Sequence, residues 1–146
     1  MTSLESLKGI QLFSGLNGEE LAAVTTLCQE KKLQPGDVIT RQGDPSSELF
    51  IITSGLVEVS VSGVGAVERV VVNLGTGQSI GEMTLVDEGT RSATVRATSQ
   101  PTVVQVIRKQ DFDRLCRENT RIGFIVMRNI AADLSFRLRH QNLLVR

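Results

Sequence analysis

The chain has 146 residues, of which 40% are hydrophobic and 22% are charged, a composition ordinary for a globular domain. Sixteen lysines and arginines balance sixteen aspartates and glutamates, which argues against a basic nucleic-acid-binding protein and against an acidic disordered tail. The length predicts one domain, residues 1–146, large enough to form a core without a metal or a disulfide. No apolar run approaches the roughly 18 residues of a membrane span, and the N-terminus does not resemble a signal peptide. We therefore expect a cytoplasmic protein with no membrane contact.

Two cysteines and one histidine limit the chemistry open to the chain. Cys28 and Cys116 lie far apart in segments with helical patterns, and we expect two reduced, buried thiols. The lone histidine, His140, argues against a histidine-cluster metal site and against Cys-His or Ser-His catalysis. We expect it to be exposed on the last helix, and we expect no metal site and no catalytic residue.

The N-terminal part, residues 1–31, has a helical pattern. Asn17 is a candidate N-cap, with Glu20 three residues further on as an imperfect capping box. Apolar residues recur at three-residue steps in two runs, namely Leu4, Leu7 and Ile10, then Leu21, Val24 and Leu27.

Residues 32–110 change to short apolar runs separated by turns. Pro35-Gly36-Asp37 and Gly43-Asp44-Pro45 are typical turn sequences, and further glycines punctuate the runs that follow. Seven or eight short strands at roughly ten-residue spacing predict a small antiparallel roll or jelly-roll barrel.

Residues 111–146 return to a helical pattern. Phe112 and Leu115 mark a short helix, and the segment after it predicts a helix of about 25 residues whose apolar stripe faces the core. The stripe has four-residue spacing and consists of Ile122, Val126, Ile130, Leu134 and Leu138. The expected fold class is therefore α+β: an eight-stranded, jelly-roll-like antiparallel β-roll flanked by N-terminal helices and a long C-terminal helix.

The stretch from Ile80 to Ala97 interrupts the strand pattern and carries the strongest chemical signal. Gly81 follows an apolar strand end and lets the backbone approach a ligand closely. The amides that open the short helix after it are unpaired donors that suit an anion. Arg91 adds a fork of donors that matches phosphate oxygens, and Glu82 supplies an acceptor for a neighbouring hydroxyl. Together these groups predict a sugar phosphate held in the wall of the roll.

The same stretch, residues 80–97, resembles the phosphate-binding cassette of cyclic nucleotide-binding domains. Gly81-Glu82 matches the family's Gly-Glu pair, and Arg91-Ser92-Ala93-Thr94-Val95 matches its arginine and the small residues after it. Leu33-Gln34-Pro35-Gly36-Asp37 and Gln42-Gly43-Asp44 look like the family's opening strands. The resemblance thus covers nearly the whole chain, with residues 111–146 as its hinge and lid helices.

The resemblance assigns roles to the cassette residues. Glu82 would accept a hydrogen bond from the ribose 2′-hydroxyl, and Arg91 would pair with the cyclic phosphate. The amides of Gly81 and Met83 would complete the phosphate cradle, and Ser92 would add a hydroxyl or amide to the phosphate or base.

Other residues are implied to lie around the ligand. Ala93 would sit against it, where a larger side chain would collide. Gln141 or Asn142, near the end of the final helix, would bond the base. Leu85 would form the apolar contact between the cassette and the helix that carries Phe112.

The sequence departs from the family pattern at three positions. Ile80 replaces an aromatic residue, and Thr84 replaces a smaller Ala or Ser. We still expect Thr84 to be one of the residues that bind the ligand. Thr90 replaces a proline, so the turn that presents Arg91 is less stiff.

The resemblance implies a non-catalytic sensor that binds a 3′,5′-cyclic nucleotide. We expect cAMP rather than cGMP, because the family most often uses threonine beside the arginine to favour guanine and this chain has Ser92. The final helix would move as a lid and offers a contact for a homodimer, and an unknown effector would receive the signal. Because the chain stops at Arg146 without a helix-turn-helix, we expect no nucleic acid contact.

Two rival hypotheses belong to other functional classes. A cupin-type metal enzyme would need two or three inward-facing histidines, and this chain has only His140. A degenerate cassette that serves only as a protein–protein scaffold is opposed solely by the presence of both Glu82 and Arg91.

Overall fold

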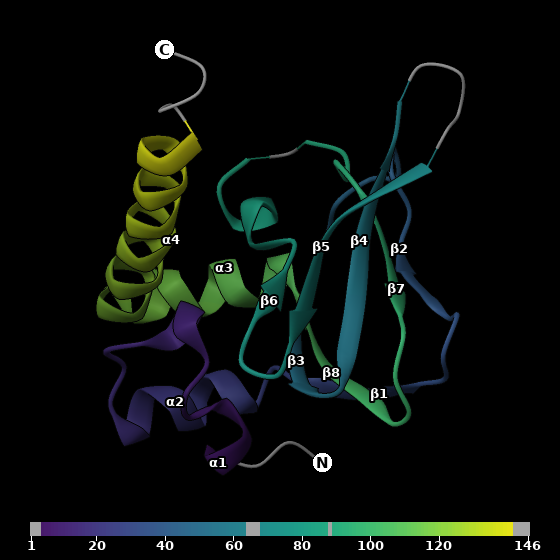
Figure 1. Cartoon of the computed structure of the whole chain (residues 1–146). Helices are drawn as coiled ribbons and strands as arrows, with labels where there is room; N and C mark the ends of the chain where they lie inside the picture. The colour runs from purple at the N-terminus through teal and green to yellow at the C-terminus, as the bar shows by residue number, and fades with distance from the viewer. Residues whose placement is uncertain (1–3, 64–67, 88, 142–146) are drawn as a thin grey trace.

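The computed structural model describes residues 4–63, 68–87 and 89–141. Two four-stranded antiparallel sheets form a roll, and the helices from both ends of the chain gather on one side of it (Figure 1). This arrangement confirms the predicted α+β class with an eight-stranded roll. None of the helices in these residues combines the length and the hydropathy of a membrane span. The elements in chain order are α1 (Leu4–Leu7), η1 (Gln11–Phe13), α2 (Gly18–Thr25), β1 (Gln29–Leu33), β2 (Val38–Thr40), β3 (Glu48–Ser54), β4 (Leu56–Ser62), β5 (Glu68–Gly75), β6 (Ser79–Ile80), η3 (Glu82–Leu85), β7 (Thr94–Ala97), β8 (Thr102–Arg108), α3 (Lys109–Glu118) and α4 (Thr120–Gln141).

Strand β3 divides the core into two parts. The strand orders are β1-β8-β3-β6 and β2-β7-β4-β5, and successive β3 side chains point to opposite faces of the first sheet. Phe50 and Ile52 therefore point into the roll with Val57 and Val104. Leu49 and Ile51 point outward and pack with the helices. Both faces of β3 are thus buried, which explains why its sequence is a continuous apolar run.

The helices pack on the outer face of the first sheet. Phe112 of α3 is fully buried there, in one cluster with Ile122 of α4 and Leu85 of η3. The predicted contact between Leu85 and the helix of Phe112 is therefore present. Through it, the short helix η3 is joined directly to the helical layer.

Two predicted boundaries differ from the structure. Helix α2 ends at Thr25 and strand β1 begins at Gln29, so the N-terminal helical segment does not extend to residue 31. Gln29 pairs with Val106 of β8, and such a long-range pairing leaves no trace in the local pattern. At the other end, α3 begins at Lys109 rather than at residue 111, because the chain turns directly from β8 into the helix.

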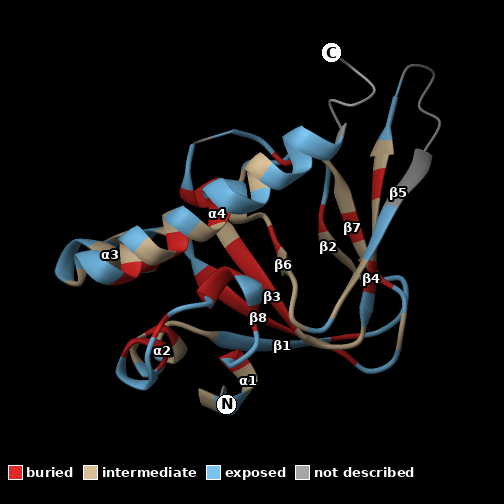
Figure 2. Ribbon diagram, turned by 60° about the vertical axis from the view of Figure 1, so that its left-hand side comes forward, coloured by how far each residue is buried: buried red, intermediate tan, exposed pale blue. Residues whose placement is uncertain are grey.

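The apolar stripe of α4 leaves the core part of the way along the helix. Ile122, Val126 and Ile130 are buried, Leu134 is half-buried and Leu138 is 57% exposed. A four-residue step overshoots one helical turn by about 40°, so the stripe rotates away from the core. The prediction that the whole stripe faces the core is wrong at Leu138, where the outer side of α4 is exposed (Figure 2).

The cysteines and the histidine lie in the helices. Neither Cys28 nor Cys116 forms a disulfide within the described residues, and each is half-buried rather than fully buried as predicted. Burial, with a smaller contribution from Asp113, raises the pKa of the Cys116 thiol to about 11. His140 is exposed near the end of α4, as predicted.

Candidate functional site

The candidate site forms where β6 ends and the short helix η3 begins. Gly81 is the residue between them and has a left-handed backbone, with φ of +78°. A Cβ atom built at this position would overlap Nη1 of Arg91 and would lie 3.3 Å from the carbonyl oxygen of Glu48. Both the backbone angle and the close approach of the guanidinium require glycine here.

Arg91 enters the site from the loop before β7. Its backbone amide donates to the carbonyl of Asp44 at 2.8 Å, and its carbonyl accepts from the amide of Gly43 at 2.9 Å. These bonds tie the arginine to the loop between β2 and β3. The residue is only 9% exposed, so the backbone directs its charge into the protein.

The buried guanidinium of Arg91 is only partly satisfied. Nη2 donates to the carbonyl of Glu48 at 2.6 Å, and the carbon Cζ lies 5.6 Å from the centre of the Phe50 ring. Nη1 is buried and has no hydrogen-bond partner within the described parts of the chain. Burial lowers the pKa of Arg91, an effect that the charge of Glu48 partly opposes. The site therefore holds a cation with a free donor, which an anion would stabilise.

Glu82 is the first residue of η3 and directly follows Gly81, which lies against the guanidinium of Arg91. Its side chain is 16% exposed. Oε2 accepts from the hydroxyl of Ser79 at 3.4 Å, and Oε1 lies 3.5 Å from Nη2 of Arg137 on α4. A carboxylate offers about four acceptor positions, so Glu82 retains capacity for a further donor.

The remaining residues of η3 differ in exposure. Thr84 is buried, and its hydroxyl donates to the carbonyl of Ser46 at 2.9 Å while its amide donates to the carbonyl of Gly81 at 3.0 Å. The hydrogen bond from the Thr84 hydroxyl to Ser46 anchors η3 to the loop before β3. Met83 is 37% exposed, so its side chain lies at the surface of the cassette.

The other predicted site residues fall in two places. Ser92 is exposed and Ala93 is half-buried, both directly after Arg91. Gln141 is the last residue of α4, but its side chain is not described, and Asn142 lies outside the described residues. The structure thus places Gly81 against Arg91, with Glu82 as the next residue of the chain. The predicted contacts of Gln141 and Asn142 lie outside the described side chains.

Three residues at the site were not predicted from the sequence. Glu48 and Phe50 belong to β3 and contact Arg91, and Arg137 belongs to α4 and contacts Glu82. Phe50 lay within a run that was predicted only as a buried strand. No local sequence pattern points to Arg137, because its partner Glu82 is 55 residues away in the sequence.

The chemistry of the site suits a phosphate better than a metal ion. The described residues contain no group of three or more His, Cys, Asp and Glu side chains placed to hold a metal. The free donor of Arg91 and the spare acceptor positions of Glu82 instead match an anion that carries a neighbouring hydroxyl. A cyclic phosphate fused to a ribose has both features.

Comparisons with known proteins agree with this chemistry. The Thermus thermophilus "Cyclic AMP receptor protein" is 35% identical over 137 residues, 94% of this chain and 61% of that protein. The "cGMP-dependent protein kinase" of Eimeria tenella is 30% identical over 132 residues, 90% of this chain and 13% of the kinase. The crystal structure of the Thermus thermophilus catabolite activator protein has a TM-score of 0.81 at 34% identity, covering 92% of this chain and 61% of that one.

The chain thus spans less than two thirds of each of these relatives. The family model "Cyclic nucleotide-binding domain" matches residues 30–119, which include the roll, the cassette and helix α3. The chain therefore belongs to the cyclic nucleotide-binding domain family.

Proposed function

We propose that residues 1–146 form one non-catalytic sensor domain that binds a 3′,5′-cyclic nucleotide at the cassette, with cAMP preferred over cGMP. Arg91 pairs with the cyclic phosphate, and Glu82 accepts a hydrogen bond from the ribose 2′-hydroxyl. The amides of Gly81 and Met83 complete the phosphate cradle, Thr84 lies in the same turn beside the ligand, and Ser92 and Ala93 lie against the ligand. Gln141 or Asn142 reaches the base.

The observation that carries this proposal is the buried, unpaired Nη1 of Arg91. A buried donor without a partner is costly, and a charged donor more so. A phosphate oxygen at Nη1 supplies both the hydrogen bond and the opposite charge. The glycine beside it, Gly81, leaves the space in which the guanidinium lies.

The choice between the two nucleotides rests on Ser92. The names of the relatives do not decide it, since one is a cyclic AMP receptor protein and the other a cGMP-dependent kinase. A serine beside Arg91 lacks the methyl group of the threonine that would favour guanine. The proposal therefore keeps cAMP as the preferred ligand.

The signal leaves the site through α4. Glu82 contacts Arg137 of this helix, and Leu85 packs in one cluster with Ile122 at its start. A ligand that shifts η3 therefore shifts the equilibrium position of α4, which an effector reads. Two cysteines without a disulfide in the described residues fit a reducing compartment, the cytoplasm.

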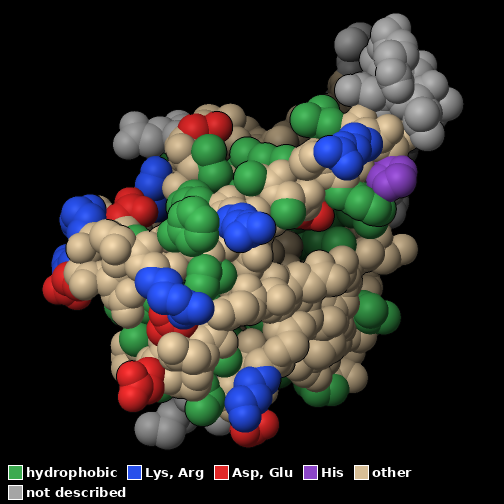
Figure 3. Space-filling model, turned by 90° about the vertical axis from the view of Figure 1, so that its left-hand side faces the viewer, with side chains coloured by type: hydrophobic (Ala, Val, Ile, Leu, Met, Phe, Trp, Pro, Cys, Tyr) green, Lys and Arg blue, Asp and Glu red, His purple; other side chains and the backbone are tan. Residues whose placement is uncertain are grey.

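The exposed side of α4 supports a homodimer as the second partner. Apolar residues on this side follow each other at alternating steps of three and four, the spacing of a coiled-coil seam. Two of them are highly exposed: Phe124 at 64% and Leu138 at 57%. Hydrophobic side chains lie among basic ones on this face of the molecule (Figure 3). The seam consists of Phe124, Met127, Ala131, Leu134 and Leu138, of which Met127 and Leu134 are half-buried and also pack against the core.

Calorimetric titration with cAMP and cGMP tests the proposed ligand. A ligand of about 22 non-hydrogen atoms at about −0.3 kcal/mol per atom gives a Kd near 10 µM, and cAMP is expected to bind at least this tightly. Arg91→Gln is expected to weaken binding about 30-fold or more, because the phosphate loses its charged partner. The exposed Arg41 provides the control, and Arg41→Gln should bind like the wild type.

Two results would contradict the proposal. Absence of heat with both nucleotides, together with no thermal stabilisation at millimolar ligand, would favour a protein–protein scaffold. Wild-type affinity in Arg91→Gln would show that the nucleotide binds elsewhere.

A further inference from the structure

Arg137 connects the final helix to the cassette. Its Nη2 atom lies 3.5 Å from Oε1 of Glu82 in η3 and 2.7 Å from Oδ2 of Asp133, one turn earlier in α4. Arg137 is 55% exposed, whereas the Glu82 side chain is only 16% exposed. The arginine thus extends from the surface of α4 to a carboxylate that is largely enclosed.

The two carboxylates have different effects on Arg137. Asp133 belongs to the same helix at i−4, so its short ion pair fixes the guanidinium relative to α4. Glu82 belongs to the cassette, so the longer ion pair fixes η3 relative to α4. Ser79 holds the other oxygen of Glu82. The Glu82 carboxylate is therefore oriented from both sides, with acceptor positions left for a third donor.

Arg137 supplies a positive charge beside Glu82, which Asp133 shares. Glu82 directly follows Gly81, which contacts the guanidinium of Arg91. A phosphate bound at Arg91 therefore brings a second negative charge close to the carboxylate of Glu82. Like charges this close repel, and the positive charge of Arg137 reduces that repulsion.

We propose that Arg137 is a positioning residue of the nucleotide site, which holds Glu82 in the orientation that receives the ribose 2′-hydroxyl and thereby links α4 to the ligand. This inference rests on the function proposed above. It adds Arg137 as the residue that orients Glu82 toward the ribose. Arg137 acts through Glu82 and is not itself assigned a contact with the nucleotide.

A thermodynamic cycle, in which two forms of the protein are each titrated with two ligands, tests this role. The affinities of wild type and Arg137→Gln are measured for cAMP and for 2′-deoxy-cAMP, which lacks the hydroxyl. We expect the variant to lose about three- to tenfold in affinity for cAMP, in the range of a partly exposed ion pair and one hydrogen bond. Its affinity for 2′-deoxy-cAMP should fall less than twofold, because this ligand has no 2′-hydroxyl to donate a hydrogen bond to Glu82.

Two further variants separate positioning from a general effect of charge. Arg137→Lys retains the cation and should recover most of the affinity for cAMP. Arg139→Gln removes the same charge two residues further along α4, where no ion pair occurs among the described contacts, and should bind cAMP like the wild type. Hydrogen exchange gives the second readout: cAMP should slow exchange in the last turns of α4 in the wild type and not in Arg137→Gln.

The outcomes distinguish this inference from the proposed function. An equal loss of affinity for both ligands in Arg137→Gln would overturn the positioning role while leaving nucleotide binding intact. Slowed exchange in α4 of Arg137→Gln on addition of cAMP would overturn the link to the helix. A wild type that binds neither nucleotide would overturn the proposed function, and the positioning role with it.

Discussion

Arg91 shows how the environment of one residue creates a binding group. Its charge is buried against a carbonyl of β3 and the ring of Phe50, which satisfies one side of the guanidinium and leaves Nη1 without a partner in the described chain. Burial disfavours the cation and lowers its pKa. An anion that binds there recovers the interaction, so the same burial that costs stability favours the ligand.

Gly81→Ala is expected to damage both stability and binding. The left-handed backbone disfavours any other residue by about 1–2 kcal/mol, and the new methyl group would displace the guanidinium of Arg91. Denaturant unfolding and cAMP titration should show both losses, with affinity reduced at least tenfold. Gly36 has φ of +92° and open space around it, so Gly36→Ala should lose stability but keep its affinity. Equal affinity losses in the two variants would show that the overlap with Arg91 is unimportant.

Ser92→Thr is expected to shift the preference of the site toward cGMP. The side chain is exposed and directly follows Arg91, so the substitution should alter recognition without disturbing the core. The added methyl group restricts the rotation of a hydroxyl that serine already has, so cGMP affinity should rise about two- to fivefold, measured as the ratio of the two Kd values. An unchanged ratio would remove Ser92 as the basis of the cAMP preference.

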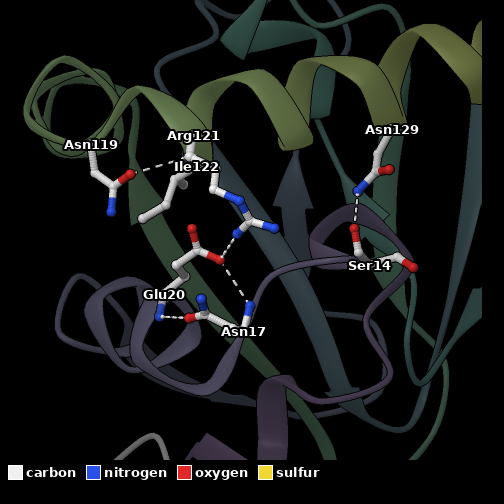
Figure 4. Close-up of polar contacts among 7 residues, drawn as sticks. All are labelled: Ser14, Asn17, Glu20, Asn119, Arg121, Ile122 and Asn129. Atoms are coloured by element: carbon white, nitrogen blue, oxygen red, sulfur yellow. Dashed lines mark hydrogen bonds and ion pairs between the residues drawn. The ribbon is translucent and has the colours of Figure 1, made fainter.

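At the scale of elements, the N-terminal helices and α4 are joined by polar contacts (Figure 4). Asn17 and Glu20 form the predicted capping box of α2, with both hydrogen bonds at 2.9 Å. The same Glu20 carboxylate pairs with Arg121 at the start of α4. Asn129, two turns later, donates to the carbonyls of Leu12 and Ser14. We therefore expect the N-terminal helices to follow α4 when it moves.

The pH dependence of stability should report this connection. Hydrogen bonds from Arg121 and from the backbone of Asn17 lower the pKa of Glu20 below its ordinary value. A carboxyl with a lower pKa in the folded state stabilises the fold above its unfolded pKa, about 4.3, and loses that effect as the pH falls through the folded value. Glu20→Gln should thus be less stable than the wild type at pH 7.

The gap between these two unfolding free energies should narrow between pH 5 and pH 3 as the wild-type carboxylate becomes protonated. Glu19→Gln, at an exposed neighbouring position, is the control and should show no such gap. A gap of constant size across this range would mean that the charge of Glu20 does not stabilise the fold.

Local sequence patterns predicted the elements well where the pattern is set by nearby residues. The turns of the roll and the capping residue Asn17 are local features, and both were found. Strand β1 was missed because it depends on pairing with β8. Within the site, the Gly-Glu and Arg-Ser pairs were recognised as a motif, whereas the contacts of Glu48 and Arg137 depend on packing between distant elements.

For the whole molecule, the exposed seam on α4 predicts association through this helix. Phe124 and Leu138 expose much of their apolar surface, and pairing two copies would bury it. Leu138→Glu should weaken the dimer at least tenfold, because it places a charge in the seam. Sedimentation equilibrium measures the effect.

Leu56 of β4 is also exposed, at 52%, but lies in a strand of the roll. Leu56→Glu is therefore the matched control and should remain dimeric. A wild-type chain that stays monomeric at high micromolar concentration would contradict the dimer.

A crystal structure of the protein with cAMP is the most direct test of how the nucleotide is held. A phosphate oxygen should lie within about 3.2 Å of Nη1 of Arg91, with the ribose 2′-hydroxyl on Glu82. Nucleotide bound elsewhere, with Nη1 still unpaired, would contradict the assigned site.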